Sequence, residues 1–172
     1  NVGYEYIGPA TGGHEYKILF TLYVDCGAGS AVPNPPATQE IGIYTHDVQN
    51  NPMGGGDKTR YELLTVNRIS NTLIEPNLPG GCSVGGSTCI REGLYEATII
   101  LPTNFTGYHL YADVCCRNAS VINVNNPINE GTGFHAYMPP PLLPNSSPVF
   151  TDLPIPFLCI NDTTSILNSA YD

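Results

Sequence analysis

Six cysteines constrain the fold of this 172-residue chain more than any other feature. The chain has no CxxC pair, and the adjacent Cys115 and Cys116 would point to opposite faces of an extended strand, which does not suit a zinc site. An even number of cysteines indicates disulfide bonds that form in an oxidising compartment. We therefore expect an exported protein at the cell surface, with metal binding by the cysteines as the less favoured alternative.

Spacing alone ranks the cysteine pairings without fixing them, because six cysteines allow many combinations. Cys82 and Cys89 flank a short Gly-rich loop, so a bridge between them closes the least chain. Cys26 and Cys116 each end a predicted strand on its inward face. The predicted pairings are Cys82–Cys89, Cys26–Cys116 and Cys115–Cys159.

The composition favours an all-β domain, and the net charge argues against nucleic acid as a partner. Charged residues make up only 12% of the chain, while Gly (18) and Pro (16) are abundant, which is unfavourable for helices. A formal net charge of -9 repels phosphate backbones and anionic lipid headgroups. No apolar run approaches the ~20 residues that a membrane helix needs, so we expect no membrane insertion and an export signal that has already been removed.

Apolar residues that alternate with polar ones predict the strands. Residues 14–26 place Tyr16, Ile18 and Phe20 on one face, and residues 108–116 repeat the pattern. Further predicted strands cover residues 4–7, 41–46, 61–67, 94–101, 133–137 and 149–160. Gly-, Pro- and Asn-rich turns separate them at short intervals. We predict an antiparallel immunoglobulin-like β-sandwich of about seven to eight strands, forming a single domain over residues 1–172 with a proline-rich connector near 138–148.

No set of residues points to catalysis or to a cofactor. The four histidines are widely spaced without a metal-binding motif, and no GxSxG occurs. Four carboxylates lie in or beside predicted strands without a recognisable cleft. We therefore expect no enzyme and no cofactor, with calcium in loops as a weak alternative. The histidines are His14, His46, His109 and His135; the carboxylates are Asp25, Glu92, Glu96 and Asp113; and the calcium candidates are Asp57, Asn161, Asp162 and Asp172.

Polar turns and tyrosines supply the remaining candidate sites. Four N-x-S/T sequences predict N-glycosylation at Asn104, Asn118, Asn145 and Asn161, and Thr163 lies in a sequence that resembles an O-glycosylation acceptor; unmodified turns are the alternative. Eleven tyrosines and no tryptophan favour an assembly or carbohydrate surface, although cross-strand pairs that only stabilise a sheet would use the same residues. The segment 1–7 could also add as a strand to a neighbouring sheet. The assembly candidates are Tyr4, Tyr6, Tyr23 and Tyr111, and Tyr44 is also predicted to face outward.

Four segments, in order along the chain, carry a resemblance to a known family. They are EYKILFTLYVDC at 15–26, YADVCCRN at 111–118, NSSPVF at 145–150 and PIPFLC at 154–159. Together they resemble the N-terminal domain of large Bacteroidota cell-surface proteins, which are described as gliding-motility-associated or type IX secreted and adhesin-like. In that family an Asp- and Gly-rich calcium linker often follows the Ala-Tyr-Asp that ends this chain, and the chain contains no such run.

The resemblance implies an extracellular role in adhesion or in a surface fibre, and no reaction. The chain is then expected to be a structural or adhesive unit of the cell surface. One form of this role is the repeating subunit of a filament assembled through β-strand and tyrosine-rich contacts. Its partners would be further copies of itself, neighbouring surface-protein domains or glycans. A carbohydrate-binding module of a secreted protein is the alternative function.

Overall fold

A computed structural model describes residues 1–27, 34–46, 58–74, 89–117, 121–142, 144–150 and 169–171, without the side chains of His46 and Lys58. Apart from one 3-10 turn at Pro127–Asn129, all regular structure in these residues is β. The described part contains no helix long and apolar enough to cross a membrane. The strands are β1 Val2–Ala10, β2 Gly13–Asp25, β3 Thr38–His46, β4 Lys58–Ile74, β5 Ile90–Leu101, β6 Tyr108–Val114, β7 Thr132–Met138, β8 Val149–Phe150 and β9 Ala170–Tyr171.

Strands β1 to β7 form one antiparallel sheet in the order β1-β2-β5-β4-β3-β6-β7, and β8 pairs with β9 separately. Strands β3, β4 and β5 follow one another as neighbours in the sheet, β2 lies beside β5, and β6 lies beside β3. Strands β3 to β6 have the order of a Greek key, with the fourth strand beside the first, and β2 to β5 have the same order when followed from β5 back to β2. The sheet therefore contains two Greek keys that share β3, β4 and β5.

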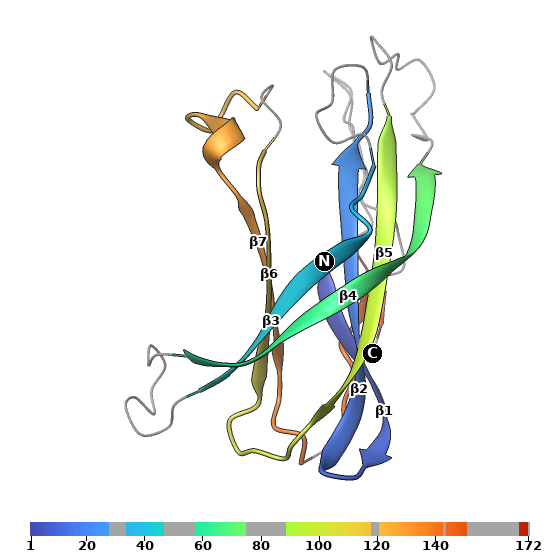
Figure 1. The fold of residues 1–172 in the computed structure, drawn as a ribbon, viewed down its shortest axis with the longest axis vertical. Helices are drawn as coiled ribbons and strands as arrows, with labels where there is room; N and C mark the ends of the chain where they lie inside the picture. Colours follow the sequence, from blue (N-terminus) through green and yellow to red (C-terminus); the bar gives the residue numbers. More distant parts are fainter. Residues whose placement is uncertain are drawn as a thin grey trace.

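The sheet curls into a half-barrel (Figure 1). Strands β3 and β4 cross the view diagonally and join the side that carries β6 and β7 to the side that carries β1, β2 and β5. The prediction of an all-β, antiparallel fold is confirmed. Because β1 to β7 are hydrogen-bonded into a single curled sheet, they do not establish an immunoglobulin-like sandwich.

The alternating patterns identified the core correctly. Tyr16, Ile18 and Phe20 of β2 are buried, as are Leu110 and Ala112 of β6. The inner side of the curled sheet is filled by the following buried residues: Val2, Tyr4, Tyr16, Ile18, Phe20, Leu22, Ile41, Ile43, Val66, Tyr95, Leu101, Tyr108, Leu110, Ala112 and Met138. The Phe20 ring also meets Phe134 of β7 edge-on, with ring centroids 5.2 Å apart. This contact joins the two sides of the half-barrel.

Three core tyrosines make the domain sensitive to alkali. Burial raises the pKa of the phenol groups of Tyr16, Tyr95 and Tyr108. The folded state therefore holds these protons more tightly than the unfolded state, so the stabilisation is complete below pH ~10 and is lost as the pH rises above it. We expect the free energy of unfolding to fall by up to about 1.4 kcal/mol per pH unit for each buried tyrosine. A pH titration should show tyrosinate absorbance rising together with loss of circular dichroism; full ionisation in a folded domain would contradict it.

Strand pairing determines the long-range disulfide bond. Asp25 at the end of β2 lies opposite Ile90 at the start of β5, so the next residues outward, Cys26 and Cys89, face each other. They form a disulfide with a Cα–Cα distance of 4.8 Å, and the Cys26 N–H donates to the Cys89 carbonyl at 2.9 Å. The bridge thus extends the β2–β5 ladder beyond its last strand residues.

The three predicted cysteine pairings were wrong. Cys89 pairs with Cys26, which excludes Cys82–Cys89 and Cys26–Cys116, and Cys115 pairs with its neighbour Cys116, which excludes Cys115–Cys159. Loop length favoured a local bridge, but the antiparallel β2–β5 pairing brings together residues separated by 63 positions. Cys115 and Cys116 follow the last residue of β6, so the face alternation used for the prediction does not apply to them. Cys82 and Cys159 lie outside the described residues.

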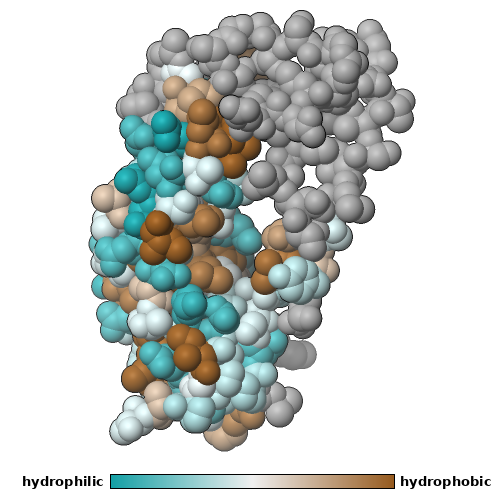
Figure 2. All heavy atoms as spheres, turned by 90° about the vertical axis from the view of Figure 1, so that its right-hand side faces the viewer, coloured by the Kyte–Doolittle hydropathy of each residue, from teal (hydrophilic) through white to brown (hydrophobic). Residues whose placement is uncertain are grey.

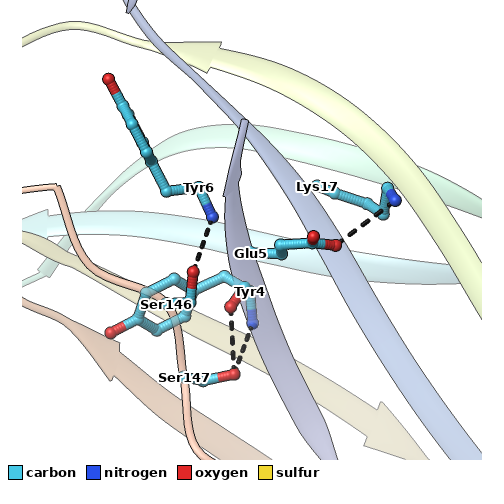
Figure 3. A network of polar contacts seen from close by, with 6 residues as sticks. All are labelled: Tyr4, Glu5, Tyr6, Lys17, Ser146 and Ser147. Atoms are coloured by element: carbon cyan, nitrogen blue, oxygen red, sulfur yellow. Dashed lines mark hydrogen bonds and ion pairs between the residues drawn. The ribbon is translucent and has the colours of Figure 1, made fainter. Parts of the chain in front are cut away.

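The outer edge of β1 is covered by residues of the proline-rich connector (Figure 3). The Ser147 hydroxyl accepts from the Tyr4 N–H at 2.9 Å and lies 3.1 Å from the Tyr4 carbonyl, to which it donates. The Tyr6 N–H donates to the Ser146 hydroxyl at 3.0 Å, and the Ser147 N–H donates to the Tyr4 carbonyl at 2.8 Å. A Cβ at Gly3 would lie 2.6 Å from the Ser147 Oγ, so glycine permits this approach. Segment 1–7 therefore belongs to the sheet of its own domain, and Ser146 and Ser147 already bond backbone groups of Tyr4 and Tyr6 at its outer edge. Its addition to a neighbouring sheet stays a prediction.

Replacement of Ser147 by alanine is expected to lower the free energy of unfolding by about 1–3 kcal/mol. The change removes both hydroxyl hydrogen bonds to Tyr4 and leaves the Tyr4 N–H, which is partly buried, without its acceptor. Ser146→Ala is the matched control, because it removes one hydrogen bond on the same strand edge and should cost less. Urea unfolding of the three proteins measures the difference. An equal or smaller loss for Ser147→Ala would show that the two hydroxyl hydrogen bonds of Ser147 to Tyr4 stabilise β1 no more than the single bond of Ser146 does.

Candidate functional site

Aromatic rings and imidazoles are concentrated on the outer side of β3, β6 and β7. Tyr44 of β3 lies directly opposite His109 of β6, and His109 lies opposite Tyr137 of β7. Two residues further along the strands, and so on the same side of the sheet, Tyr111 lies opposite His135. The neighbouring residues Leu110 and Ala112 point into the core. We refer to Tyr44, His109, Tyr111, His135 and Tyr137 as the aromatic face.

Two glycines provide space for the tyrosines of the aromatic face. A Cβ at Gly42 would lie 2.6 Å from a ring carbon of Tyr44, and a Cβ at Gly133 would lie 2.7 Å from the Tyr111 hydroxyl. A side chain at either position would have to displace the tyrosine. The glycines therefore let these side chains lie against the sheet rather than stand away from it.

The two histidines of the aromatic face form a direct contact. The His109 Nδ1 and the His135 Nε2 lie 2.8 Å apart, which is a hydrogen-bond distance. The ring planes are tilted by only 16°, but the centroids are 5.1 Å apart, so with touching nitrogens the rings lie end to end rather than face to face. His109 lies on the outer side of the sheet, yet it is only 8% exposed, because Tyr137 covers it at a centroid distance of 5.0 Å.

A fixed loop adjoins the aromatic face. The Asn104 Oδ1 accepts from the Thr106 N–H at 2.9 Å and from the Gly107 N–H at 2.5 Å, which closes an Asx turn. The Tyr137 hydroxyl donates to the Thr106 carbonyl at 3.1 Å and ties the loop to the face. Phe105 lies between these anchors and is 86% exposed. The loop thus presents an apolar ring to solvent without needing to be ordered by a partner.

The tyrosines predicted for assembly occupy different environments. Tyr4 is only 4% exposed and packs edge-on against Tyr16 in the core, so its prediction as a surface contact was wrong. Tyr6 is half-buried and also packs against Tyr16. Tyr23 and Tyr111 are exposed as predicted, but the Tyr23 hydroxyl donates to Glu92 at 2.8 Å on the β2–β5 part of the sheet. Of the four candidates, only Tyr111 belongs to the aromatic face.

Other parts of the surface carry hydrophobic residues in smaller groups. Figure 2 shows the side of the molecule that lies to the right in Figure 1, where hydrophobic groups alternate with hydrophilic ones. Exposed apolar residues of β4 and β5 include Ile69, Leu73 and Ile100. Scattered apolar residues of this kind are normal on a protein surface and indicate no site by themselves.

The structure bears on two of the five predicted glycosylation positions. Asn145 is exposed, so its amide is accessible. The Asn104 Nδ2, the atom that would carry a sugar, is buried and has no hydrogen-bond partner, while its Oδ1 is held by the Asx turn. The folded domain therefore does not offer Asn104 for modification. Asn118, Asn161 and Thr163 lie outside the described residues.

The acidic residues considered for catalysis lie on two parts of the sheet: Asp25, Glu92 and Glu96 on β2 and β5, and Asp113 on β6. The Asp25 carboxylate accepts from the Gly27 N–H at 2.8 Å, and the Glu92 carboxylate accepts from the Tyr23 hydroxyl. Among the described residues, no group of three or more histidine, cysteine, aspartate or glutamate side chains could hold a metal ion. The calcium candidates Asp57, Asn161, Asp162 and Asp172 lie outside them.

The sequence did not identify Tyr137 as part of a site, the two glycines that make room for Tyr44 and Tyr111, or the contact between the two histidines. Tyr137 and His135 alternate with apolar residues along one predicted strand, which places them on the same face, but the partner strand and its register are not readable from that pattern. Comparisons of the chain with known protein families, with curated proteins and with solved structures found no match.

Proposed function

We propose that the chain is an extracellular structural or adhesive domain of a cell surface that binds its partners through the aromatic face. The observation that carries this proposal is the concentration of three tyrosines and two histidines on one outer side of the sheet. Tyr111 and Tyr137 are 44% and 46% exposed, and their rings supply contact area at a low entropic cost. The expected partners are further copies of the chain or neighbouring surface domains.

The disulfide bonds support an extracellular location. Cys26–Cys89 and Cys115–Cys116 suit an oxidising compartment, since glutathione keeps cytosolic thiols reduced. The resemblance of the four sequence segments to Bacteroidota surface proteins points the same way. We also propose that the half-barrel is a variant of the immunoglobulin-like fold; the two Greek keys support this, because such connections are typical of β-sandwiches.

Assembly through side chains fits the domain better than strand addition at its N-terminal segment. One edge of β1 pairs with β2. At its other edge, the hydroxyls of Ser146 and Ser147 accept hydrogen bonds from backbone N–H groups of β1. The aromatic face and the exposed Phe105 beside it need no such rearrangement before they contact a partner. A filament of this chain would therefore be held by tyrosine-rich contacts, and no catalytic role is proposed.

Self-association of the purified chain tests the leading proposal. We expect larger species to form with rising concentration in sedimentation velocity experiments, and filaments to appear in negative-stain images. Tyr111→Ser combined with Tyr137→Ser should remove them, because both exposed rings of the face are lost. Tyr23→Ser is the matched control, since it removes an exposed tyrosine from the β2–β5 part of the sheet. A wild-type chain that stays monomeric at every concentration would contradict self-assembly.

A carbohydrate-binding module is the second candidate. It is favoured by rings that lie against a sheet beside polar groups, because the apolar face of a sugar can stack on an aromatic ring while its hydroxyls meet the polar neighbours. A glycan array separates the candidates: hits lost in the double tyrosine variant of a monomeric chain would favour the module. An array without hits would remove it.

A further inference from the structure

We propose that His109 and His135 bind a divalent first-row transition metal of the zinc, nickel and copper type. The fold brings these two histidines together from separate strands, with the His109 Nδ1 and the His135 Nε2 only 2.8 Å apart. Imidazole nitrogens are preferred ligands of these metals, whereas Ca²⁺ and Mg²⁺ prefer oxygen. This inference concerns a metal site and does not depend on the proposed adhesive function.

The register of β6 and β7 determines where the two histidines lie in the sheet. His109 lies opposite Tyr137, and Tyr111 lies opposite His135, so the histidines are diagonal neighbours on adjacent antiparallel strands. Diagonal side chains on the same face are within reach of each other when they are long. Burial beneath Tyr137 holds His109, whereas His135 is exposed and can adjust its ring to a ligand. One fixed and one adjustable ligand suit a site that is open to solvent.

The distance between the nitrogens is close to that of a chelating pair. Zinc–nitrogen bonds of about 2.0–2.1 Å at a tetrahedral angle place two ligating nitrogens roughly 3.3 Å apart. To admit the ion, the nitrogens must move apart by roughly half an ångström. Because the rings now lie end to end, His135 must also turn so that its Nε2 points at an ion beside the line between the two nitrogens. The proton now shared between the two nitrogens must leave this position, either to the other nitrogen of its ring or to solvent. Water would fill the remaining positions of the metal.

The surroundings favour a cation of this class. The residues directly opposite the two histidines in the sheet are tyrosines: Tyr44 and Tyr137 oppose His109, and Tyr111 opposes His135. None of these three carries a positive charge at neutral pH that would repel a metal ion. The net charge of -9 adds a general attraction for cations.

Zinc titration of the full chain, without a polyhistidine tag and after removal of metals by a chelator, tests the proposal. Calorimetry at neutral pH is expected to show one zinc ion per chain. His135→Ala should weaken the affinity by at least about 10-fold, because it turns a chelating pair into a single ligand. His14→Gln is the matched control: His14 is a partly buried histidine that contacts Tyr6 on another part of the sheet, and its loss should leave zinc binding unchanged. His135 is the exposed member of the pair, so its replacement should not unfold the domain.

Nuclear magnetic resonance locates the ion independently of affinity. Paramagnetic Ni²⁺ added below one equivalent should broaden the imidazole signals of His109 and His135 first and leave those of His14 sharp. The proposal is overturned if zinc does not bind, if His135→Ala binds as tightly as the wild type, or if broadening begins elsewhere. If His135→Ala loses zinc binding but still self-associates, the result supports the metal site and leaves the proposed adhesive function unaffected.

Discussion

Replacement of both Cys26 and Cys89 by serine is expected to lower the free energy of unfolding by about 4 kcal/mol. The bridge joins residues 63 positions apart, so its loss frees a long loop in the unfolded chain. A loss of this size is a large share of the roughly 5–15 kcal/mol that stabilises an ordinary domain. Chemical denaturation of the oxidised wild type and the variant, followed by circular dichroism, measures it.

The second disulfide supplies the control for this experiment. Cys115 and Cys116 are adjacent, so their bridge closes no long loop, and Cys115→Ser with Cys116→Ser should cost much less in chain entropy. Both double variants remove two sulfur atoms and one covalent link. If the two lose the same stability, the constraint on the β2–β5 connection is not what the long-range bridge contributes.

Phe20→Ala is expected to destabilise the domain by about 3–5 kcal/mol, the range seen when a buried phenylalanine is truncated. Phe20 is almost completely buried, and its ring contacts Tyr95 of β5 and Phe134 of β7 at centroid distances of 5.8 and 5.2 Å. It therefore fills the space between the two sides of the half-barrel, and a methyl group leaves a cavity there. Thermal and urea unfolding measure the loss.

Phe20→Leu distinguishes the free-energy cost of the cavity from the cost of losing the aromatic contacts. Leucine keeps most of the buried volume but none of the ring contacts, so its cost should be well below that of alanine. A loss under about 1 kcal/mol for Phe20→Ala would mean that the β2 and β7 sides are not packed against each other through this ring.

The all-β, antiparallel character of the fold was predictable because local patterns determine it, whereas the immunoglobulin-like sandwich stays a proposal. The alternation at 14–26 identified the buried face of β2, and the same pattern at 108–116 identified that of β6. Each predicted strand lies within or overlaps an observed one, but the ends differ, by as much as seven residues at the end of β4, because strand ends depend on pairing partners. For the last predicted strand, residues 149–150 are β8 and residues 151–160 lie outside the described residues.

Long-range pairing could not be predicted from the same patterns. One of the two neighbours of β2 in the sheet is β5, which starts 65 positions after β2 ends, and this pairing brings Cys26 opposite Cys89. Loop-closure entropy favours the nearest cysteine, but the interactions of twelve paired positions between β2 and β5 decide the register. The same limitation concealed the contact between His109 and His135, which depends on the β6–β7 register.

The candidate site was predictable only in part. Tyr111 was correctly placed outward by alternation, whereas the ring of Tyr4, which was named as an assembly candidate, packs into the core. The first three residues after Asn1 are all buried, because β1 lies between β2 on one side and the connector on the other. Alternation within β1 could not reveal the connector, since its serines lie 140 and 143 positions away from the residues they bond.

Peptide mapping of the unreduced protein by mass spectrometry tests the central claim, a disulfide-closed β2–β5 ladder in an oxidised, exported domain. After the free thiols are blocked and the chain is digested, we expect a peptide pair linked through Cys26 and Cys89. The peptide that contains Cys115 and Cys116 should be lighter than its reduced form by two hydrogen atoms. Blocked thiols at Cys26 and Cys89, or a peptide linked through Cys82 and Cys89, would contradict the strand pairing and the location proposed for this protein.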